Sequence, residues 1–172
     1  MRRIANVRRV RLFLAEPRDA AAIAALRNRA ADALTDAFGP GHWSSHASEK
    51  GVRSGMKRSS VYVARRRGRI VATLTLQTRK PWAIDMAYFS PRTRPLYLID
   101  MAVEPTLQRA GIGRACLEAA RGIAARLPAD AIRLDAYDAE AGAGTFYAKC
   151  GYREVGRVVY RNTPLVYYEI VV

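Results

Sequence analysis

A single α/β domain built on a central mixed sheet is the fold class that this 172-residue sequence predicts. Strand-like and helix-like segments follow one another in the order β-α-α-β-β-β-α-β-α-β-β. The most apolar segment, residues 96–103, has the nearly continuous hydrophobic run of a central strand covered on both faces. No internal repeat or linker divides the chain, and its length suits one domain.

The N-terminal part of this domain predicts one strand and two helices. Residues 10–15 are strong β formers. Glu16 and Pro17 mark a helix start, because Glu16 can cap the helix and Pro17 fits its first turn. Residues 39–41 stop this helix, and a short second helix is expected at about residues 48–56. The long helix carries one apolar stripe, formed by Ile23, Leu26, Ala30, Leu34 and Phe38.

The remaining elements complete a sheet of about six to seven strands flanked by about four helices. Residues 65–69 form a hairpin turn in which Gly68 supplies the special dihedral angle. The connection over residues 78–95 is rich in aromatics, which indicates either a functional loop or a flap packed on the core. Further strands are expected at residues 61–64, 70–76, 96–103, 131–136, 152–160 and 165–172, and helices at 112–127 and 143–149.

The formal net charge of +14 first suggests a nucleic acid as partner. The basic residues, however, are mostly arginines scattered through an alanine-rich sequence rather than gathered in one block. An anionic small ligand explains part of the charge equally well, so nucleic acid is not expected as the main partner.

The chain is expected to be cytoplasmic and free of membrane contact. No apolar run approaches the roughly 20 residues that a membrane span needs, and no apolar segment follows the basic N-terminus. We expect a loose basic tail over residues 1–9 and one domain over residues 10–172. Cys116 and Cys150 are expected to be reduced, buried thiols, and no cluster of residues predicts a metal site.

The most informative stretch is residues 98–114, in which a buried strand runs into a tight loop that opens onto a helix. Gly111 and Gly113 allow a ligand to approach the backbone, and the first helical turn presents free N–H groups and a positive dipole. Arg109 and Arg114 add positive charge. These features predict a pyrophosphate site.

Two other phosphate-binding patterns fit this stretch poorly. The P-loop pattern needs a Lys-Ser or Lys-Thr pair after its last glycine, which is missing. The dinucleotide fingerprint requires a third small residue where Cys116 stands, and it places its glycines directly at the strand end, whereas residues 104–110 intervene here.

Two motifs resemble the GNAT superfamily of acyl-CoA N-acyltransferases. Residues 108–113, Gln-Arg-Ala-Gly-Ile-Gly, match that family's Q/R-x-x-G-x-G/A motif in every specified position. Residues 143–152 resemble its A-x-x-F-Y-x-K-x-G-F/Y segment, and the order of elements agrees from about residue 10 to residue 172. One departure is Glu140, which stands where the family often has an asparagine that helps to hold CoA.

The resemblance implies acetyl-CoA, or a related acyl-CoA, as co-substrate. A strand bulge would open the cleft, the pantetheine arm would pair beside Met101, Ala102 and Val103, and a backbone N–H near Met101 would polarise the thioester carbonyl. Lys149 would either contact a CoA phosphate or be a solvated cation at a helix end. The pyrophosphate would be wrapped by the backbone of Gln108, Arg109, Ala110, Gly111, Ile112, Gly113 and Arg114.

The reaction implied is direct attack of an amine on the thioester, so neither cysteine has to act as a nucleophile. Tyr147 is the candidate general acid that protonates the departing thiolate, with packing as its alternative role. Asp100, an acid inside an apolar strand, is the first candidate general base, and its alternative is a buried acid bonded to backbone. Glu104 is the second candidate.

The acceptor is expected between residues 42–60 and residues 82–89, where this family varies. His42 and Trp43 either line the acceptor pocket or belong to a plain loop. His42 and His46 are spaced like metal ligands, but no acid or cysteine completes a metal site with them. The remaining candidate substrate-binding residues are Trp82, Tyr88 and Tyr97, of which Tyr97 would orient a water.

The sequence therefore predicts an N-acetyltransferase acting on a small or amino-acid-like amine. A non-catalytic acyl-CoA sensor, a basic nucleic-acid-associated protein, and acetylation of protein N-termini or lysines remain alternatives. The final two strands form either a homodimer edge or simply the end of the sheet.

Overall fold

The computed structural model describes residues 10–172, and the tail predicted over residues 1–9 lies outside the described residues. Within this range one seven-stranded sheet has the order β1-β2-β3-β4-β5-β7-β6. Its strands are β1 (Leu12–Leu14), β2 (Ser60–Arg66), β3 (Arg69–Gln77), β4 (Pro95–Val103), β5 (Ala131–Tyr137), β6 (Arg153–Tyr160) and β7 (Thr163–Val171). The helices are α1 (Ala20–Phe38), α2 (Glu49–Met56), α3 (Ile112–Arg126) and α4 (Gly144–Lys149). The single mixed α/β fold is confirmed, with every expected element present.

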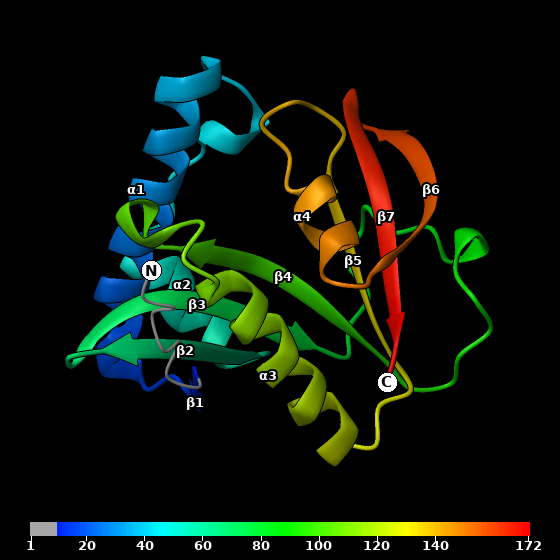
Figure 1. Ribbon diagram of the computed structural model, residues 1–172, viewed down its shortest axis with the longest axis horizontal. Coiled ribbons are helices and arrows are strands. Elements are labelled where there is room, and N and C mark those ends of the chain that lie inside the picture. The colour runs from blue at the N-terminus through cyan, green and yellow to red at the C-terminus, as the bar shows by residue number, and fades with distance from the viewer. Residues whose placement is uncertain (1–9) are drawn as a thin grey trace, which may run out of the picture.

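The sheet is covered differently on its two faces (Figure 1). Helix α3 lies in front of strands β2–β4 in Figure 1, and it shares with α4 an apolar core over the sheet. Helices α1 and α2 lie behind the same strands and pack on Val61, Val63 and Ile70. The 78–95 segment packs on the remaining strands of the sheet through Ile84 and Phe89, so it covers core rather than hanging free.

Strands β4 and β5 form the one parallel pair among the described strands, and they diverge after three residues. Pairing joins residues 95–97 to residues 131–133 and then stops. The pairing of β3 with β4 also shifts, since Thr73 pairs with Ala102 but Thr75 pairs with Ile99. Two residues of β4 therefore stand opposite one residue of β3, which is a β-bulge. The bulge leaves residues 98–103 without a strand partner on the β5 side among the described residues.

One local expectation for α1 is wrong in detail. Its stripe is buried at Ile23 and Leu26, but Phe38 is exposed because the end of α1 projects beyond the sheet (Figure 1). The helix start is a short 3-10 turn (Pro17–Asp19) with Glu16 as its N-cap and Pro17 in its first position, as the sequence predicts. Asp19 completes a capping box by accepting the Glu16 backbone N–H at 2.9 Å, and the Glu16 side chain also pairs with Arg18.

An ion pair holds the 78–95 segment to the sheet from inside. Arg133 of β5 is fully buried, and its Nε donates to Glu169 of β7 at 2.8 Å. Its remaining donors face the 78–95 segment, where the guanidinium binds the Ser90 carbonyl and lies 5.0 Å from the Phe89 ring centroid. Ser90 in turn donates to Glu169 at 2.6 Å. The sequence left open whether this segment is a functional loop or a flap on the core. The structure shows that its middle part packs on the core as a flap.

The final hairpin completes the sheet. Strand β7 lies between β5 and β6, so Tyr167 and Tyr168 are buried in the interior rather than placed at an edge. Strand β6 is the outermost strand on this side. No helix in residues 10–172 is long and apolar enough to cross a bilayer.

Candidate active site

The predicted phosphate loop has the geometry of an anion site. After a short 3-10 turn (Pro105–Leu107), Arg109 and Gly111 adopt left-handed φ angles of 61° and 81°. Gly111 is the N-cap of α3, so no side chain at this position occupies the N–H groups of the first helical turn. A Cβ at Gly111 would meet no atom within 4 Å, which leaves the loop open above the helix end. This is the arrangement that binds phosphate groups.

The second glycine of the motif also has a packing role. A Cβ at Gly113 would lie 3.0 Å from the Phe146 ring and 3.6 Å from Val103. Gly113 therefore lets α3 approach both α4 and the end of β4. This close packing fixes the position of Tyr147, which follows Phe146 on α4.

The other residues predicted to hold the donor surround this loop. Gln108 turns its amide back to the Val103 carbonyl at 3.3 Å, and Arg114 donates to the Lys149 carbonyl at 2.9 Å. Ala110 and Lys149 are exposed, whereas the Ile112 side chain is buried in the core and leaves only its backbone available. Met101, Ala102 and Val103 form the end of β4 that diverges from β5.

The candidate base stands at the bulge, and the candidate acid approaches the residue that follows it. Asp100 has a left-handed φ of 54° at the bulge. Tyr147 is buried, and its hydroxyl lies 3.9 Å from the sulfur of Met101, the residue after Asp100. Burial raises the pKa of Tyr147, and the nearby charge of Asp135 raises it further. The phenol is therefore protonated at neutral pH, as a proton donor must be.

The two candidate bases differ in how they are held. Asp100 is 51% exposed and meets Arg27 at 3.4 Å, a long contact that leaves most of its carboxylate accessible. Glu104 is only 17% exposed and accepts hydrogen bonds from Arg29 at 2.8, 3.1 and 3.4 Å. Glu104 therefore anchors α1 to the end of β4, and Asp100 is the more accessible of the two.

Both cysteines are free thiols, and the expected burial is confirmed for Cys116 but only in part for Cys150. Cys116 is 1% exposed in the core, and burial raises its pKa to about 11. Cys150 is half-buried at the end of α4, and burial raises its pKa as well. Neither is a thiolate at neutral pH. Across residues 10–172, no group of three potential metal ligands comes together.

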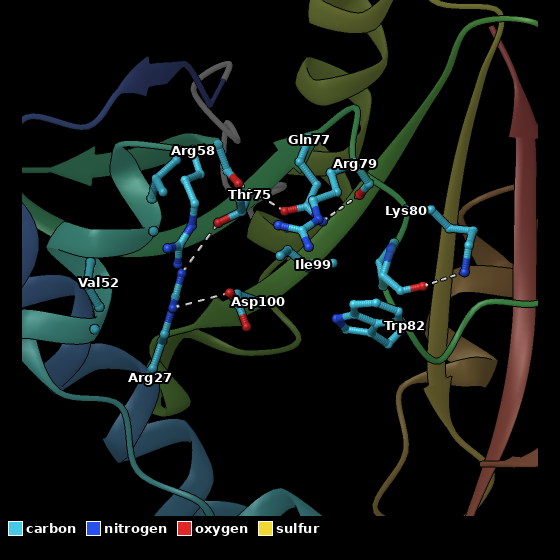
Figure 2. Close-up of a pocket in the computed structure, with 15 residues that line it drawn as sticks. Arg27, Val52, Arg58, Thr75, Gln77, Arg79, Lys80, Trp82, Ile99 and Asp100 are labelled. Atoms are coloured by element: carbon cyan, nitrogen blue, oxygen red, sulfur yellow. Dashed lines mark hydrogen bonds and ion pairs between the residues drawn. The ribbon is translucent and has the colours of Figure 1, made fainter. Parts of the chain in front are cut away.

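A cavity of about 370 Å³ lies on the α1–α2 side of the bulge. Helix α2 and the start of the 78–95 segment form its walls, and Ile99 and Asp100 of β4 line it (Figure 2). These walls belong to the two regions between which the acceptor was expected. Trp82 lies across the cavity from Val52 in Figure 2 and is 80% exposed.

The other predicted acceptor-binding aromatics lie away from this cavity. His42 and Trp43 pack on Tyr137 at the end of β5, and the Tyr137 hydroxyl donates to the His42 carbonyl at 3.1 Å. Tyr88 packs edge-on against Tyr167. Tyr97 is buried, and its hydroxyl donates to the Met86 sulfur at 3.1 Å.

The family assignment rests on a comparison that covers the motifs described above. Residues 57–154, more than half of the chain, match the family model described as acetyltransferase (GNAT) domain. This range includes the bulge, the phosphate loop and the Phe146-Tyr147 helix. The chain belongs to the GNAT acetyltransferase family. It is thereby an acyl-CoA-dependent N-acetyltransferase by class.

Solved structures share this GNAT fold at low sequence identity. An aminoglycoside acetyltransferase in complex with coenzyme A is 16% identical, with a TM-score of 0.74 and 94% of each chain covered. A ribosomal-protein-alanine N-acetyltransferase from Brucella melitensis is 16% identical, with a TM-score of 0.69, covering 94% of this chain and 99% of that one. A putative acetyltransferase from Salmonella typhimurium with its cofactor acetyl-CoA is 15% identical, with a TM-score of 0.68 and coverage of 95% and 94%. No curated protein matches.

The structure also places residues in this GNAT site that the sequence analysis missed. Arg27 and Arg58 line the cavity. The sequence indicated only that Arg27 lies in a helix and that Arg58 lies in an irregular segment, not that they face a common site. Asp135 lies partly buried on β5 beyond the point of divergence, and burial raises its pKa. The alternation of β5 could have indicated that Asp135 shares a face with Arg133, opposite the apolar residues that face α3.

Proposed function

We propose that this protein transfers the acetyl group of acetyl-CoA to the amine of a small or amino-acid-like acceptor. The observation that carries the proposal is the convergence at the bulge. An open phosphate loop, a strand edge without a partner, a buried phenol and an accessible carboxylate meet where β4 leaves β5.

The donor fits along the α3–α4 side. The loop from Gln108 to Arg114 would bind the pyrophosphate through backbone N–H groups, and the free edge of residues 101–103 would pair with the pantetheine arm. Exposed Lys149 lies at the end of α4, where it would contact a CoA phosphate. Glu140 replaces the family's asparagine, so the backbone of the loop would hold the donor without that contact.

The proton transfers balance with the residues present. Asp100 takes one proton from the acceptor's ammonium group, and the freed nitrogen then attacks the thioester carbonyl, for which a backbone N–H near Met101 is the oxyanion donor. The C–N bond forms, the C–S bond breaks, and the thiolate takes the Tyr147 hydroxyl proton. The second proton on nitrogen restores the phenol, so the products are an amide, the CoA thiol and one proton.

The donor half of the proposal is tested by calorimetric titration of acetyl-CoA into the wild type and Gly111→Glu. The new side chain would place bulk and a negative charge where the pyrophosphate binds, so we expect micromolar binding to fall at least about 100-fold. Gly68→Glu is the matched control, because Gly68 also has a left-handed φ (78°) with no atom near its Cβ position.

Both variants carry the same charge change and a similar backbone strain, but only one alters the loop. Equal binding by Gly111→Glu and the wild type, or no binding by the wild type, would reject the donor site. Release of thiol in the presence of a panel of amines then tests the transfer itself.

A further inference from the structure

The cavity beside the bulge is strongly basic. Four cationic side chains line it, Arg27, Arg58, Arg79 and Lys80, against the single carboxylate of Asp100. Lys80 turns its ammonium to the backbone carbonyls of Pro81 and Ile84, at 3.1 and 2.7 Å. The three arginines are therefore the cations that can bind a ligand in this cavity. Among residues 10–172, neither Arg58 nor Arg79 forms an ion pair.

Arg27 is held out of water with few partners. Its side chain is 18% exposed. Burial lowers its pKa by more than the charge of Asp100 raises it. One terminal nitrogen lies 3.4 Å from Asp100 and another lies 3.5 Å from the Thr75 hydroxyl, both near the limit of a hydrogen bond (Figure 2). Its Nε is buried and has no partner among the described residues.

A guanidinium in this state favours an anion. It presents five N–H donors in a fixed fork, and burying them without acceptors is unfavourable. A carboxylate that entered the cavity would accept two parallel hydrogen bonds from the fork of Arg27, with Arg58 as a second cation. The long contact with Asp100 leaves room for such an exchange, since a carboxylate from the ligand can satisfy Arg27 better.

Resting on the proposed function, we infer that the acceptor is an amine that carries a carboxylate close to its amino group, as an α-amino acid does. Arg27 and Arg58 bind the carboxylate, and Asp100 receives the ammonium group at the bulge. Because Arg27 and Asp100 lie side by side, the site presents a positive and a negative group to the two opposite charges of a zwitterion. The apolar wall of Val52, Val61 and Ile99 contacts the side chain of the acceptor.

The volume of the cavity agrees with an acceptor of this size. About 370 Å³ lies at the small end of small-molecule sites, which run from roughly 300 to 1,000 Å³. A polycationic acceptor would have to approach three arginines with one carboxylate to compensate, which is electrostatically unfavourable.

The test compares each free amino acid with its own amide, which keeps the amine and the side chain and lacks the anion. Thiol release from acetyl-CoA is measured for apolar and polar amino acids, their amides, and a linear polyamine. We expect the acids to have kcat/KM about 10- to 100-fold above their amides, the ratio typical of a charge-assisted hydrogen-bond pair. Arg27→Gln and Arg58→Gln should bring this ratio close to one by raising KM for the acid, with kcat less affected.

Two further variants separate recognition from general effects. Arg27→Lys keeps the charge but loses the fork, so it should recover only part of the preference. Arg53→Gln removes a cation from the same helix as the cavity wall, but Arg53 pairs with Glu49 outside the cavity, so its ratio should equal that of the wild type. Acetyl-CoA titration of every variant reports folding and the donor site independently.

The inference is overturned if amides or the polyamine are preferred, or if no amino acid binds the CoA-loaded protein in calorimetry. It is also overturned if Arg27→Gln and Arg58→Gln leave the acid-to-amide ratio unchanged. Unchanged acetyl-CoA affinity in any of these cases would leave the proposed donor site intact, so the two failures are distinguishable.

Discussion

The two sides of the sheet meet at the Asp100 bulge but are built by different means. On the α3–α4 side, backbone geometry and apolar contacts dominate, with Gly111 opening the loop and Gly113 packing against Phe146. On the other side, arginine–carboxylate pairs tie the elements together: Arg27–Asp100, Arg29–Glu104, Arg65–Asp19 and Arg133–Glu169. The proposed donor side therefore depends on local backbone conformation, and the proposed acceptor side depends on charges brought together from distant segments.

The largest effect that tests this comparison is on stability. Glu169→Leu leaves Arg133 charged and unpaired in the interior, so we expect the free energy of unfolding to fall by about 3–5 kcal/mol. Urea denaturation measures it. Glu49→Gln removes an exposed pair along helix α2 and should cost only about 0.3–0.5 kcal/mol. Similar losses in both variants would contradict the view that the buried pair holds the 78–95 segment.

The same pair should make the protein acid-sensitive. Burial raises the pKa of Glu169, but the hydrogen bonds from Ser90 and Arg133 outweigh it, so the net pKa is lowered. A lowered folded-state pKa gives a stability contribution that is complete above the unfolded value, about 4.5, and is lost as the pH falls through the folded value. Stability measured from pH 7 downward should fall below about pH 4.5, and less steeply in Glu169→Leu.

The contrast between the two sides also explains what the sequence could predict. Every strand and helix was predictable because its periodicity and turns are local, as at the Arg67-Gly68 hairpin. The phosphate loop could be predicted because its strand, glycines and helix are contiguous in the sequence. The sequence could not show that Arg27 and Arg58 line the same cavity, since only the fold brings α1, α2 and β4 around it. His42, Trp43 and Tyr97 lie outside this cavity, which the sequence does not indicate because aromatic character does not say which surface a side chain packs on.

A smaller effect, on rate alone, is expected at the point where the two sides meet. Tyr147→Phe removes the hydroxyl near Met101 and keeps the ring in the core, so kcat should fall about 100-fold, at the lower end of general acid–base effects, with acetyl-CoA affinity unchanged. Steady-state thiol release measures this.

Tyr152→Phe is the matched control for this variant. Its ring packs edge-on against Tyr147, and its hydroxyl is buried without a partner among the described residues. Removing that hydroxyl should leave kcat unchanged and should not reduce stability. If both variants lose the same activity, Tyr147 acts through packing and the proton donor lies elsewhere.

The smallest expected effect is at the cysteine of the donor side. Direct transfer predicts that Cys116→Ala keeps wild-type kcat, because the thiol is buried in the core and its pKa is raised to about 11. A covalent acetyl-cysteine route would instead require a thiolate near neutral pH, which burial opposes. Kinetics of the variant, together with mass spectrometry of wild-type protein incubated with acetyl-CoA alone, separates the two routes. An acetylated Cys116 peptide together with an inactive variant would replace direct attack by a two-step transfer, and an active, unmodified enzyme leaves the chemistry at the bulge between Asp100 and Tyr147.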